Sequence, residues 1–388
     1  MRVLVLASLF PHAHNETLGL STYRRTAPMA AWCDLKVISL RTRNDLPERE
    51  TFGGLDVIRP RWWRVPKLSV LLDGYVYAAL AGRALRRVCP DFDPDLIDAH
   101  WLYPDGFGAV RLARRLGKPV VLNGRGSDVN EFCFRWPMRP FARRALRAAT
   151  HLIAVSSPLK EKMIEAGAPA DRITVVTNGV DTALYRPGDR DAARRALGVP
   201  SVPTILLSAG SVVVGKGFQH LIAGLALLPA VLSVHLYIAG PGPYRDTLER
   251  VARETGVADR VTLLGRVAQE RMPQWYRAAD FFCFGSLREG CPNVVLESLA
   301  CGTPVVSTRV GGVPDLVDDG RTGLLFEPGS PEAFARTLQQ AVGRSWDREA
   351  IAAHGASRSW QHTARECFAV FERVLAQREE EEKRSHHG

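Results

Sequence analysis

The sequence contains no long hydrophobic run and no paired cysteines. None of its apolar stretches reaches the roughly 18 consecutive residues of a membrane-spanning helix. The seven cysteines of the 388-residue chain are odd in number, scattered, and never spaced as Cys-x-x-Cys. We therefore expect no membrane span, no disulfide framework and no structural zinc, and we predict a protein of the reducing cytoplasm.

Signatures of metal, dinucleotide and nucleic-acid binding are also missing. The acidic stretch DFDPD, residues 91–95, precedes an apolar strand instead of following one, so it predicts a polar turn and no required metal. The stretch GPGPYR, residues 240–245, lacks the full Gly-x-Gly-x-x-Gly pattern of a dinucleotide site. No nucleic-acid-binding motif is visible. We expect no bound cofactor.

The positive charge of the chain lies entirely in its first half. Residues 1–200 carry 31 lysines and arginines against 20 aspartates and glutamates, whereas residues 201–388 carry 20 against 21. An anionic partner such as a phosphate, a lipid headgroup or a nucleic acid would suit this excess. A solvated, arginine-rich surface with no such partner is the competing interpretation.

One segment of the first half mixes positive charge with tryptophan. The stretch RPRWWRVPKLSV, residues 59–70, suits a membrane interface or an acceptor pocket, and an ordinary packed loop is the alternative. We hypothesise peripheral contact with an anionic membrane surface, on the inner face of the plasma membrane. The residues concerned are Trp62 and Trp63, with Arg59, Arg61, Arg64 and Lys67 around them.

Short apolar runs alternate with helical patterns along the whole chain. Most runs are continuous Val, Ile and Leu, which is typical of parallel strands covered on both faces. A stretch rich in proline, glycine and charge, residues 185–203, interrupts the alternation and predicts an interdomain connection that contains one short helix. The fold class is therefore α/β, with two Rossmann-like doubly wound domains, 1–184 and 204–357, facing a central cleft. Ligands of such sheets bind at the carboxyl ends of the strands. The charged tail, residues 379–388, is expected to be disordered.

The stretch REGCPNVVLESLACGTPVV, residues 288–306, predicts an anion site. A strand should end near Gly285 and a helix should begin near Pro292, where proline's missing amide costs nothing. The next three amides are then expected to point out of the helix N-terminus, where the helix dipole favours a phosphate. These are the amides of Asn293, Val294 and Val295.

Two acidic residues flank this predicted anion site. Glu297 follows Asn293 by one helical turn, and Glu289 lies in the loop before the helix. One carboxylate on each side of a diphosphate could accept hydrogen bonds from a sugar and from a ribose. The competing interpretation is a helix with acids near its N-terminus, which dipole effects alone explain.

The same stretch resembles the retaining glycosyltransferases of family 4, which have the GT-B fold, and most of all the bacterial cell-surface polysaccharide members. The resemblance covers nearly the whole chain through ordered motifs at appropriate spacings. They are SLFPHAHNETLG near the start, DAHWLYPDGFGAVRLARRLGKPVV (98–121), RGSD (125–128), TNGVDTALYRPG (177–188), GKGFQHLI (215–222), AGPGPYRDTLE (239–249), the stretch 276–306 and GGVPDLVDDGRTGLLFEPG (311–329).

The resemblance implies a role for each matching residue. Glu289 would bind hydroxyls of the donor sugar, Glu297 would bind the ribose, and Lys216 would neutralise the diphosphate as the leaving group departs. Gly19 would let its loop approach the phosphates. The remaining donor-binding positions are Gly265, Arg266 and Val267 at the base, and Gly290, Cys291, Pro292, Asn293, Val294 and Val295 at the sugar and distal phosphate.

Two positions depart from the family pattern. Where relatives commonly have a second phosphate-binding arginine, this chain has Ser211, so either the donor affinity is weaker or another arginine substitutes, with Arg125 and Arg266 as candidates. The motif RGSD replaces His-Gly-x-Asp, and Arg125 cannot shuttle a proton, so any catalytic role it has is electrostatic. Asp128 of this motif and His100 are acceptor-side candidates, together with Trp62 and Trp63. A structural histidine is the competing interpretation of His100.

The predicted activity is metal-independent, retaining hexosyl transfer from a nucleoside diphosphate sugar to a glycan or lipid-linked hydroxyl. A UDP-sugar is preferred over GDP-mannose. The resemblance assigns no carboxylate as a nucleophile, and it implies reaction on one face of the sugar, as in retaining members of this fold. The resemblance also implies that a helix, residues 358–378, crosses back to the N-terminal domain. A nucleotide-sugar epimerase of the same fold and a nonenzymatic basic nucleic-acid-binding protein are the alternatives.

Overall fold

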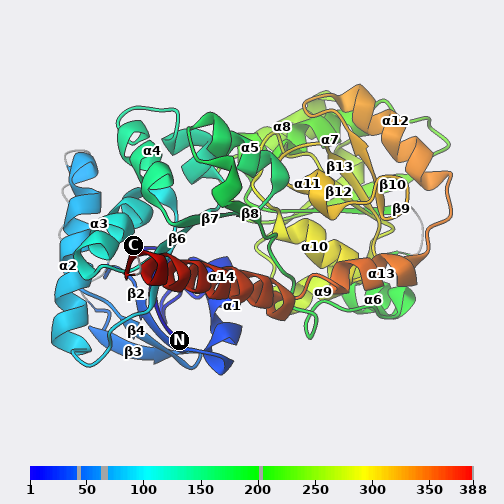
Figure 1. Ribbon diagram of the computed structural model, residues 1–388. Coiled ribbons are helices and arrows are strands. Elements are labelled where there is room, and N and C mark those ends of the chain that lie inside the picture. Colours follow the sequence, from blue (N-terminus) through cyan, green and yellow to red (C-terminus); the bar gives the residue numbers. More distant parts are fainter. Residues whose placement is uncertain (42–44, 63–68, 201–203, 387–388) are drawn as a thin grey trace. The chain divides into compact units, whose positions relative to one another are not determined.

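The apolar runs of the sequence form two separate sheets. The computed structural model describes residues 1–41, 45–62, 69–200 and 204–386 (Figure 1). The chain divides into unit 1, Met1–Asn178 with Trp360–Gly388, and unit 2, Gly179–Ser359. Both units combine a largely parallel sheet with helices, as the GT-B fold class requires.

The sheet of unit 1 has eight strands in the order β3-β4-β2-β1-β5-β6-β7-β8. All neighbours pair in parallel except β3 and β4, which are antiparallel. The strands are β1 (Arg2–Leu6), β2 (Asp34–Ile38), β3 (Arg49–Phe52), β4 (Leu55–Ile58), β5 (Leu96–His100), β6 (Val120–Gly124), β7 (His151–Ala154) and β8 (Ile173–Val175). The helices are α1 (Leu20–Thr26), α2 (Asp73–Val88), α3 (Phe107–Leu116), α4 (Arg139–Ala148), α5 (Ser157–Glu165) and α14 (Trp360–His386).

The sheet of unit 2 has six parallel strands in the order β11-β10-β9-β12-β13-β14. They are β9 (Thr204–Ala209), β10 (Val234–Ala239), β11 (Val261–Gly265), β12 (Phe281–Phe284), β13 (Val305–Thr308) and β14 (Gly323–Phe326). The helices are α6 (Arg190–Leu197), α7 (Phe218–Leu225), α8 (Arg245–Glu254), α9 (Met272–Ala278), α10 (Asn293–Ala300), α11 (Val313–Leu316), α12 (Pro331–Val342) and α13 (Arg348–Ala356).

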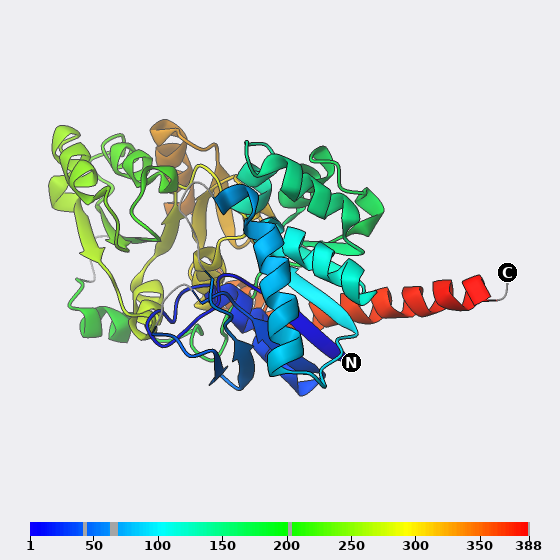
Figure 2. The same ribbon diagram turned by 90° about the vertical axis from the view of Figure 1, so that its left-hand side faces the viewer.

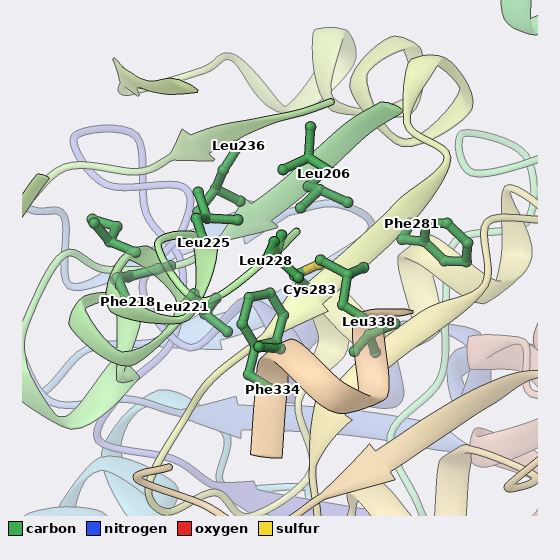
Figure 3. Packing of buried hydrophobic residues seen from close by; sticks show 14 of the residues in the cluster. Leu206, Phe218, Leu221, Leu225, Leu228, Leu236, Phe281, Cys283, Phe334 and Leu338 are labelled. Carbon is green, nitrogen blue, oxygen red and sulfur yellow. The ribbon is translucent and has the colours of Figure 1, made fainter. Parts of the chain in front are cut away.

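Each unit has its own hydrophobic core. In unit 2, side chains of α7 and α12 meet those of β9, β10 and β12, and Figure 3 shows Phe218, Leu221 and Phe334 converging there. In unit 1, the core joins the strands to the first turns of α14 through Cys367, Phe368 and Phe371. Figure 2 shows α14 as one continuous helix to its end.

Two predicted boundaries require correction. Unit 2 begins at Gly179, before the predicted connection 185–203, and the short helix expected in that segment is α6, which packs on α9. Asp189 caps α6 by accepting a hydrogen bond from the Ala192 amide at 2.9 Å. The tail predicted to be disordered from residue 379 is helical through His386, as a continuation of α14. Strand β3 was missed because its sequence, RETF, has no apolar run.

The helix α14 makes a testable contribution to the stability of unit 1. Replacing the fully buried Phe371 with alanine should cost about 3–5 kcal/mol of unfolding free energy, because it removes an aromatic ring from a closed core. Glu372→Ala, on the exposed face of the same turn, is the matched control and should change stability by under about 0.5 kcal/mol. Urea denaturation of both variants checks this. Equal stabilities would contradict the placement of α14 in this core.

Candidate functional site

The two central strands of unit 2 create a crevice at their carboxyl ends. Strand β9 is followed in sequence by β10 and β11 on one side, whereas β12 pairs with its other side. The order of strands therefore reverses between β9 and β12. Loops 210–217 and 285–292 leave the sheet at this point, which is where open α/β sheets bind their ligands.

Glycines let the backbones around this point approach closely. Gly217 has φ +66°, and a Cβ there would lie 1.8 Å from the carbonyl oxygen of Gly285. Gly311 has φ +49°, and its Cβ would lie 2.2 Å from the carbonyl oxygen of Glu289. Only glycine satisfies both constraints at each position. The loops after β9, β12 and β13 are thereby held against one another.

This packing brings Lys216 and Glu289 together across 73 residues of sequence. The Lys216 ammonium lies 2.5 Å from Oε1 of Glu289, and both side chains are partly buried. The Ser286 hydroxyl donates to the same oxygen at 2.7 Å. The Lys216 ammonium also lies 5.9 Å from the centre of the Phe284 ring. Two residues that the sequence predicted as catalytic thus form one charged pair at the crevice.

The helix α10 differs in detail from the sequence prediction. It begins at Asn293, and Pro292 is the capping residue with an extended backbone, ψ 113°. The Val295 amide was expected to be free for a phosphate, but it donates to the Pro292 carbonyl at 3.2 Å. Val295 and Pro292 are also buried. The expectation is therefore wrong for the Val295 amide, because the first turn of the helix closes on its own cap.

Glu297 is fixed by a buried tyrosine. The Tyr276 hydroxyl donates to Oε2 of Glu297 at 2.9 Å. Burial, with the nearby Glu297 carboxylate, raises the pKa of Tyr276 well above its usual value, so the hydroxyl stays protonated and remains a donor. Glu297 is itself half-buried at the fourth residue after Asn293. Sequence reasoning missed Tyr276, which appears in its motif as an ordinary core aromatic.

A hollow of about 420 Å³ lies beside the charged pair. Lys216 lines it together with Arg288, which sequence reasoning also missed. Apolar side chains form much of the remaining lining, including the partly exposed Val213 and Leu287. The signal that could have identified Arg288 is its position immediately before Glu289. Unit 2 thus places a second cation near Lys216, where Ser211 replaces the expected arginine.

The other predicted donor residues of unit 2 lie along the same edge of the sheet. Ser211 is exposed and its carbonyl accepts from the Val213 amide at 2.9 Å. Gly265 ends β11 with φ +68°, and its carbonyl accepts from the Gly240 amide at 2.7 Å. Arg266 is exposed and Val267 is half-buried. Gly290 accepts from the Gly312 amide at 2.8 Å, and Cys291 is buried.

Unit 1 contains a buried polar cluster near the carboxyl ends of β5 and β6. The guanidinium of Arg25, on α1, lies 2.9 Å from Oδ2 of Asp98 and 2.8 Å from Nε2 of His100. The Asn123 amide donates to Oδ1 of Asp98 at 2.6 Å. All four side chains are at most 1% exposed. His100 is therefore an interior residue of unit 1, which agrees with its structural interpretation.

Ion pairing and hydrogen bonds within the cluster offset the cost of burying the charges of Arg25 and Asp98. Burial would raise the pKa of Asp98, but Arg25 and the hydrogen bonds of His100 and Asn123 lower it to about 2. Burial and the charge of Arg25 lower the pKa of His100 to about 4, so His100 is neutral. Its Nδ1 atom is buried without a hydrogen-bond partner among the described residues.

Asp128 orders the turn that carries Arg125. Its Oδ1 accepts from the Arg125 and Gly126 amides at 2.9 and 2.8 Å, and its Oδ2 accepts from the Leu102 amide at 3.1 Å. The carboxylate is completely buried. These contacts correct the prediction of Asp128 as an acceptor-side residue, because its oxygens bind backbone amides of the turn.

Of the remaining candidates of unit 1, Gly19, Arg59 and Trp62 belong to the described residues and Trp63 does not. Gly19 has φ +64°, and a Cβ there would lie 2.2 Å from the Leu9 carbonyl oxygen, so close backbone approach requires glycine. Trp62 is half-buried, whereas Trp63 lies outside the described residues. Arg59 is buried and paired with Glu50 at 2.7 Å, so it cannot contribute to a membrane surface.

Metal and membrane-spanning features are missing from the described ranges. No group of three or more histidine, cysteine, aspartate or glutamate side chains there could hold a metal ion. Within the DFDPD turn, Asp93 pairs with Lys118 at 2.8 Å and Asp95 accepts from the Arg2 amide at 2.7 Å. No described helix is long and apolar enough to cross a membrane.

Comparison with known proteins gives consistent matches in both units. Residues 29–184 match the family described as Glycosyltransferase Family 4, and residues 203–343 match the one described as Glycosyl transferases group 1. The D-inositol 3-phosphate glycosyltransferase of Acidothermus cellulolyticus is 31% identical over 377 residues, which cover 89% of this chain and 82% of that protein. The protein of the same name from Mycolicibacterium gilvum is 36% identical over 250 residues. That match covers 62% of this chain and 56% of the relative, so the chain spans little more than half of its length.

Solved structures show the same fold at low sequence identity. The sucrose-phosphate synthase of Thermosynechococcus elongatus has a TM-score of 0.81 and 20% identity, covering 97% of this chain and all of that one. Anabaena HepE in complex with UDP has a TM-score of 0.75 and 21% identity, covering 96% of this chain and all of that one.

The buried cluster of unit 1 predicts a specific pH dependence of stability. The pKa of His100 is lower in the folded state than in the unfolded state. Between pH 6.5 and about 4, the unfolded chain therefore binds a proton at His100 and the folded chain does not. His100 should therefore lower the unfolding free energy as pH drops through this window, by on the order of 3 kcal/mol. The buried carboxyl of Asp105, whose pKa is raised to about 7 by burial, contributes a change of opposite sign over the same pH range. The lowered pKa of Asp98 adds a loss only below pH 3.8.

His100→Gln should remove the contribution of His100, since glutamine does not titrate, so the difference in unfolding free energy between the variant and the wild type should change with pH across this window. The exposed His362 on α14 provides the control variant, His362→Gln, which should retain the wild-type slope. Urea denaturation at several pH values between about 7 and 4.5 measures it. A wild-type slope in His100→Gln would show that other groups cause the acid sensitivity.

Proposed function

This chain belongs to glycosyltransferase family 4 and has the GT-B fold, and on that premise we propose that it transfers a sugar from a nucleoside diphosphate sugar to a hydroxyl of a glycan or lipid-linked acceptor, with retention at the anomeric carbon. The observation that carries the proposal is the Lys216–Glu289 pair at the crevice of unit 2. A cation and a carboxylate side by side suit a ligand that has both a diphosphate and sugar hydroxyls.

In this proposal, Lys216 and Arg288 bind the diphosphate. Both line the hollow at the crevice, so a diphosphate there would meet two positive side chains despite the serine at position 211. Negative charge grows on the diphosphate as the bond to the sugar breaks. Fixed cations stabilise that charge more in the transition state than in the ground state, and this difference accelerates transfer.

Glu289 is then available to the sugar. In the ligand-free pair, its Oε1 accepts from both Lys216 and Ser286. A diphosphate competes for the lysine, and the released carboxylate can accept hydrogen bonds from sugar hydroxyls while Ser286 keeps it oriented. Glu297, which Tyr276 holds in place through Oε2, is positioned to accept hydrogen bonds from the ribose diol.

The proposed reaction occurs on one face of the sugar. The bond from the anomeric carbon to the diphosphate oxygen breaks, the bond to the acceptor oxygen forms on the same face, and the acceptor proton passes to the departing phosphate oxygen. No protein nucleophile is required, so the protein acts by positioning and by charge stabilisation. Arg125 contributes charge only, in a turn that Asp128 fixes.

A UDP-sugar is the preferred donor and GDP-mannose the second. HepE, which shares the fold, is known in complexes with UDP and with UDP-glucose. The named inositol phosphate relatives make a polyol phosphate a further acceptor to include with glycans and lipid-linked sugars. No metal or cofactor enters the proposed reaction.

A peripheral membrane location is supported by an exposed apolar edge of unit 1. Leu72 is 59% exposed and Tyr75 is 39% exposed around the start of α2, and Trp136 is 76% exposed in the segment before α4. The centre of the Tyr75 ring lies 6.3 Å from that of the Phe141 ring on α4 and 4.4 Å from the Arg111 guanidinium. Exposed leucine and aromatic side chains with a nearby arginine suit the interface of an anionic membrane on the cytoplasmic side.

Kinetics of two variants test the donor site. Glu297→Ala should raise the donor KM roughly 10- to 100-fold, because a charged hydrogen bond to the ribose contributes about 1.5–3 kcal/mol. Glu289→Ala should instead lower kcat by a similar factor. Release of UDP or GDP, with and without candidate acceptors, measures both. Glu249→Ala, an exposed residue of α8 paired with Arg245, is the control and should behave as wild type. Wild-type kinetics in both site variants would refute the assignment.

Co-flotation with vesicles tests the membrane location. The protein should float with vesicles containing anionic lipid at low salt and dissociate at high salt. Leu72→Asp combined with Trp136→Ala should reduce binding at least about tenfold, since each side chain loses apolar contact with the interface. Val231→Asp, which changes the 92% exposed valine of unit 2, is the control. Failure of the wild type to float at low salt would remove the membrane proposal and leave the donor site untouched.

A further inference from the structure

A cavity of about 820 Å³ lies in unit 1 at the amino-terminal edge of its sheet. The starts of β6 and β7 form its floor through Val120 and His151, and the ends of α3 and α4 lie beside it. The second half of α14, from Arg373 onward, forms a further wall. The Arg125 turn follows β6 and therefore belongs to the opposite, carboxyl edge of the same sheet. This cavity is separate from the proposed reaction site.

The lining of this cavity is strongly basic. Six cationic side chains line it against three carboxylates, those of Asp171, Glu380 and Glu381. Positive charge gathered in one hollow attracts anions more strongly than the same charge spread over a flat surface. The cationic side chains are Arg114, Lys118, Arg172, Arg373, Arg378 and Arg384.

Most of these cations have no carboxylate to neutralise them. Lys118 pairs with Asp93 and Arg378 pairs with Glu382, each at 2.8 Å. The other four arginines form no ion pair within the described part of the chain. Like charges that line one cavity repel one another, so an anion between them would lower the energy of the folded unit.

The floor of the cavity adds hydrogen-bonding capacity without adding charge. His151 is 7% exposed, and its Nε2 lies 2.9 Å from the Thr174 hydroxyl. Burial, followed by the positive charge of Arg373, lowers the pKa of His151, so the ring is neutral. The field of Arg373 therefore reaches the floor of the cavity.

We propose that this cavity binds an anion with several phosphate groups, through Arg114, Arg172 and Arg373. Guanidinium groups bind phosphate oxygens in pairs, and several arginines around one hollow suit clustered phosphates. The volume is within the range of small-ligand sites and exceeds the needs of a single phosphate ion. The three arginines are exposed, so a ligand reaches them without a rearrangement of the chain.

Bound ligand would join the middle of α14 to the sheet. Arg373 lies halfway along α14, whereas Arg114 lies near the end of α3 and Arg172 lies just before β8. A phosphate cluster between them joins these elements by charge-assisted hydrogen bonds. Occupancy of the site should therefore slow hydrogen exchange in the turns of α14 around Arg373.

Titration calorimetry of the full chain with sodium tripolyphosphate at low ionic strength tests the proposal. The donor site in unit 2 also attracts phosphates, so the experiment uses Lys216→Ala as the background. We expect this variant to retain binding. In the same background, combined Arg114→Ala, Arg172→Ala and Arg373→Ala should weaken binding at least about tenfold, because each lost guanidinium removes charged hydrogen bonds.

Two further variants test whether the loss of binding comes from the loss of positive charge or from damage to the fold. Arg114, Arg172 and Arg373 changed to lysine keep the charge and should recover part of the affinity. Glu380→Gln with Glu381→Gln removes two carboxylates from the lining and should strengthen binding about threefold or more. An unchanged melting temperature without ligand confirms that each variant folds. The proposal is overturned if tripolyphosphate binding disappears in Lys216→Ala, or if the triple alanine variant binds as tightly as its background.

The source of the phosphates is distinguished by a second arm. The same variants are mixed with vesicles of neutral lipid, with and without phosphatidic acid. Competition of tripolyphosphate with phosphatidic acid vesicles, lost in the triple alanine variant, identifies a lipid phosphate as a ligand of this cavity. Binding of tripolyphosphate without such competition identifies a soluble phosphate ligand. Failure of both probes to bind the Lys216→Ala chain refutes the site.

Discussion

The proposed chemistry depends on one close approach of backbones in unit 2. Lys216 and Glu289 are 73 residues apart and meet only because glycines at 217 and 311 let three loops touch above the sheet. A side chain larger than hydrogen at either glycine would separate these loops. The ion pair is thus a consequence of loop packing, and the charge it gathers lies where the strand order reverses.

Unit 1 also depends on a close contact between distant residues, in this case a buried group of hydrogen-bonded polar side chains. It buries an arginine, an aspartate, a histidine and an asparagine together, and each hydrogen-bonds to at least one of the others. Buried charges of this kind are tolerated only when they are paired. The cluster ties α1 to β5 and β6, and the same β6 continues into the turn that carries Arg125.

Much of the architecture could be predicted from the sequence, because continuous Val, Ile and Leu runs are a direct signature of parallel strands. The edge strand β3 was missed because its sequence, RETF, alternates exposed and half-buried residues and has no continuous apolar run. The short helix expected within 185–203 is α6, but its cap at Asp189 and its packing on α9 depend on geometry that the sequence does not show. Within the site, Glu289 and Lys216 were found through their motifs. Arg288 and Tyr276 were missed because their positions depend on which loops and helices pack together, and a single sequence does not encode that locally.

The chain leaves unit 1 at Asn178 and returns to it at Trp360, so the whole of unit 2 is an insertion in the sequence of unit 1. During synthesis, the core of unit 1 therefore lacks Cys367, Phe368 and Phe371 until α14 emerges from the ribosome. Unit 2 has all of its strands and helices available earlier. The unit made second is thus the first that can complete its core, and the apolar side chains of unit 1 that pack on α14 remain uncovered until that helix has been made.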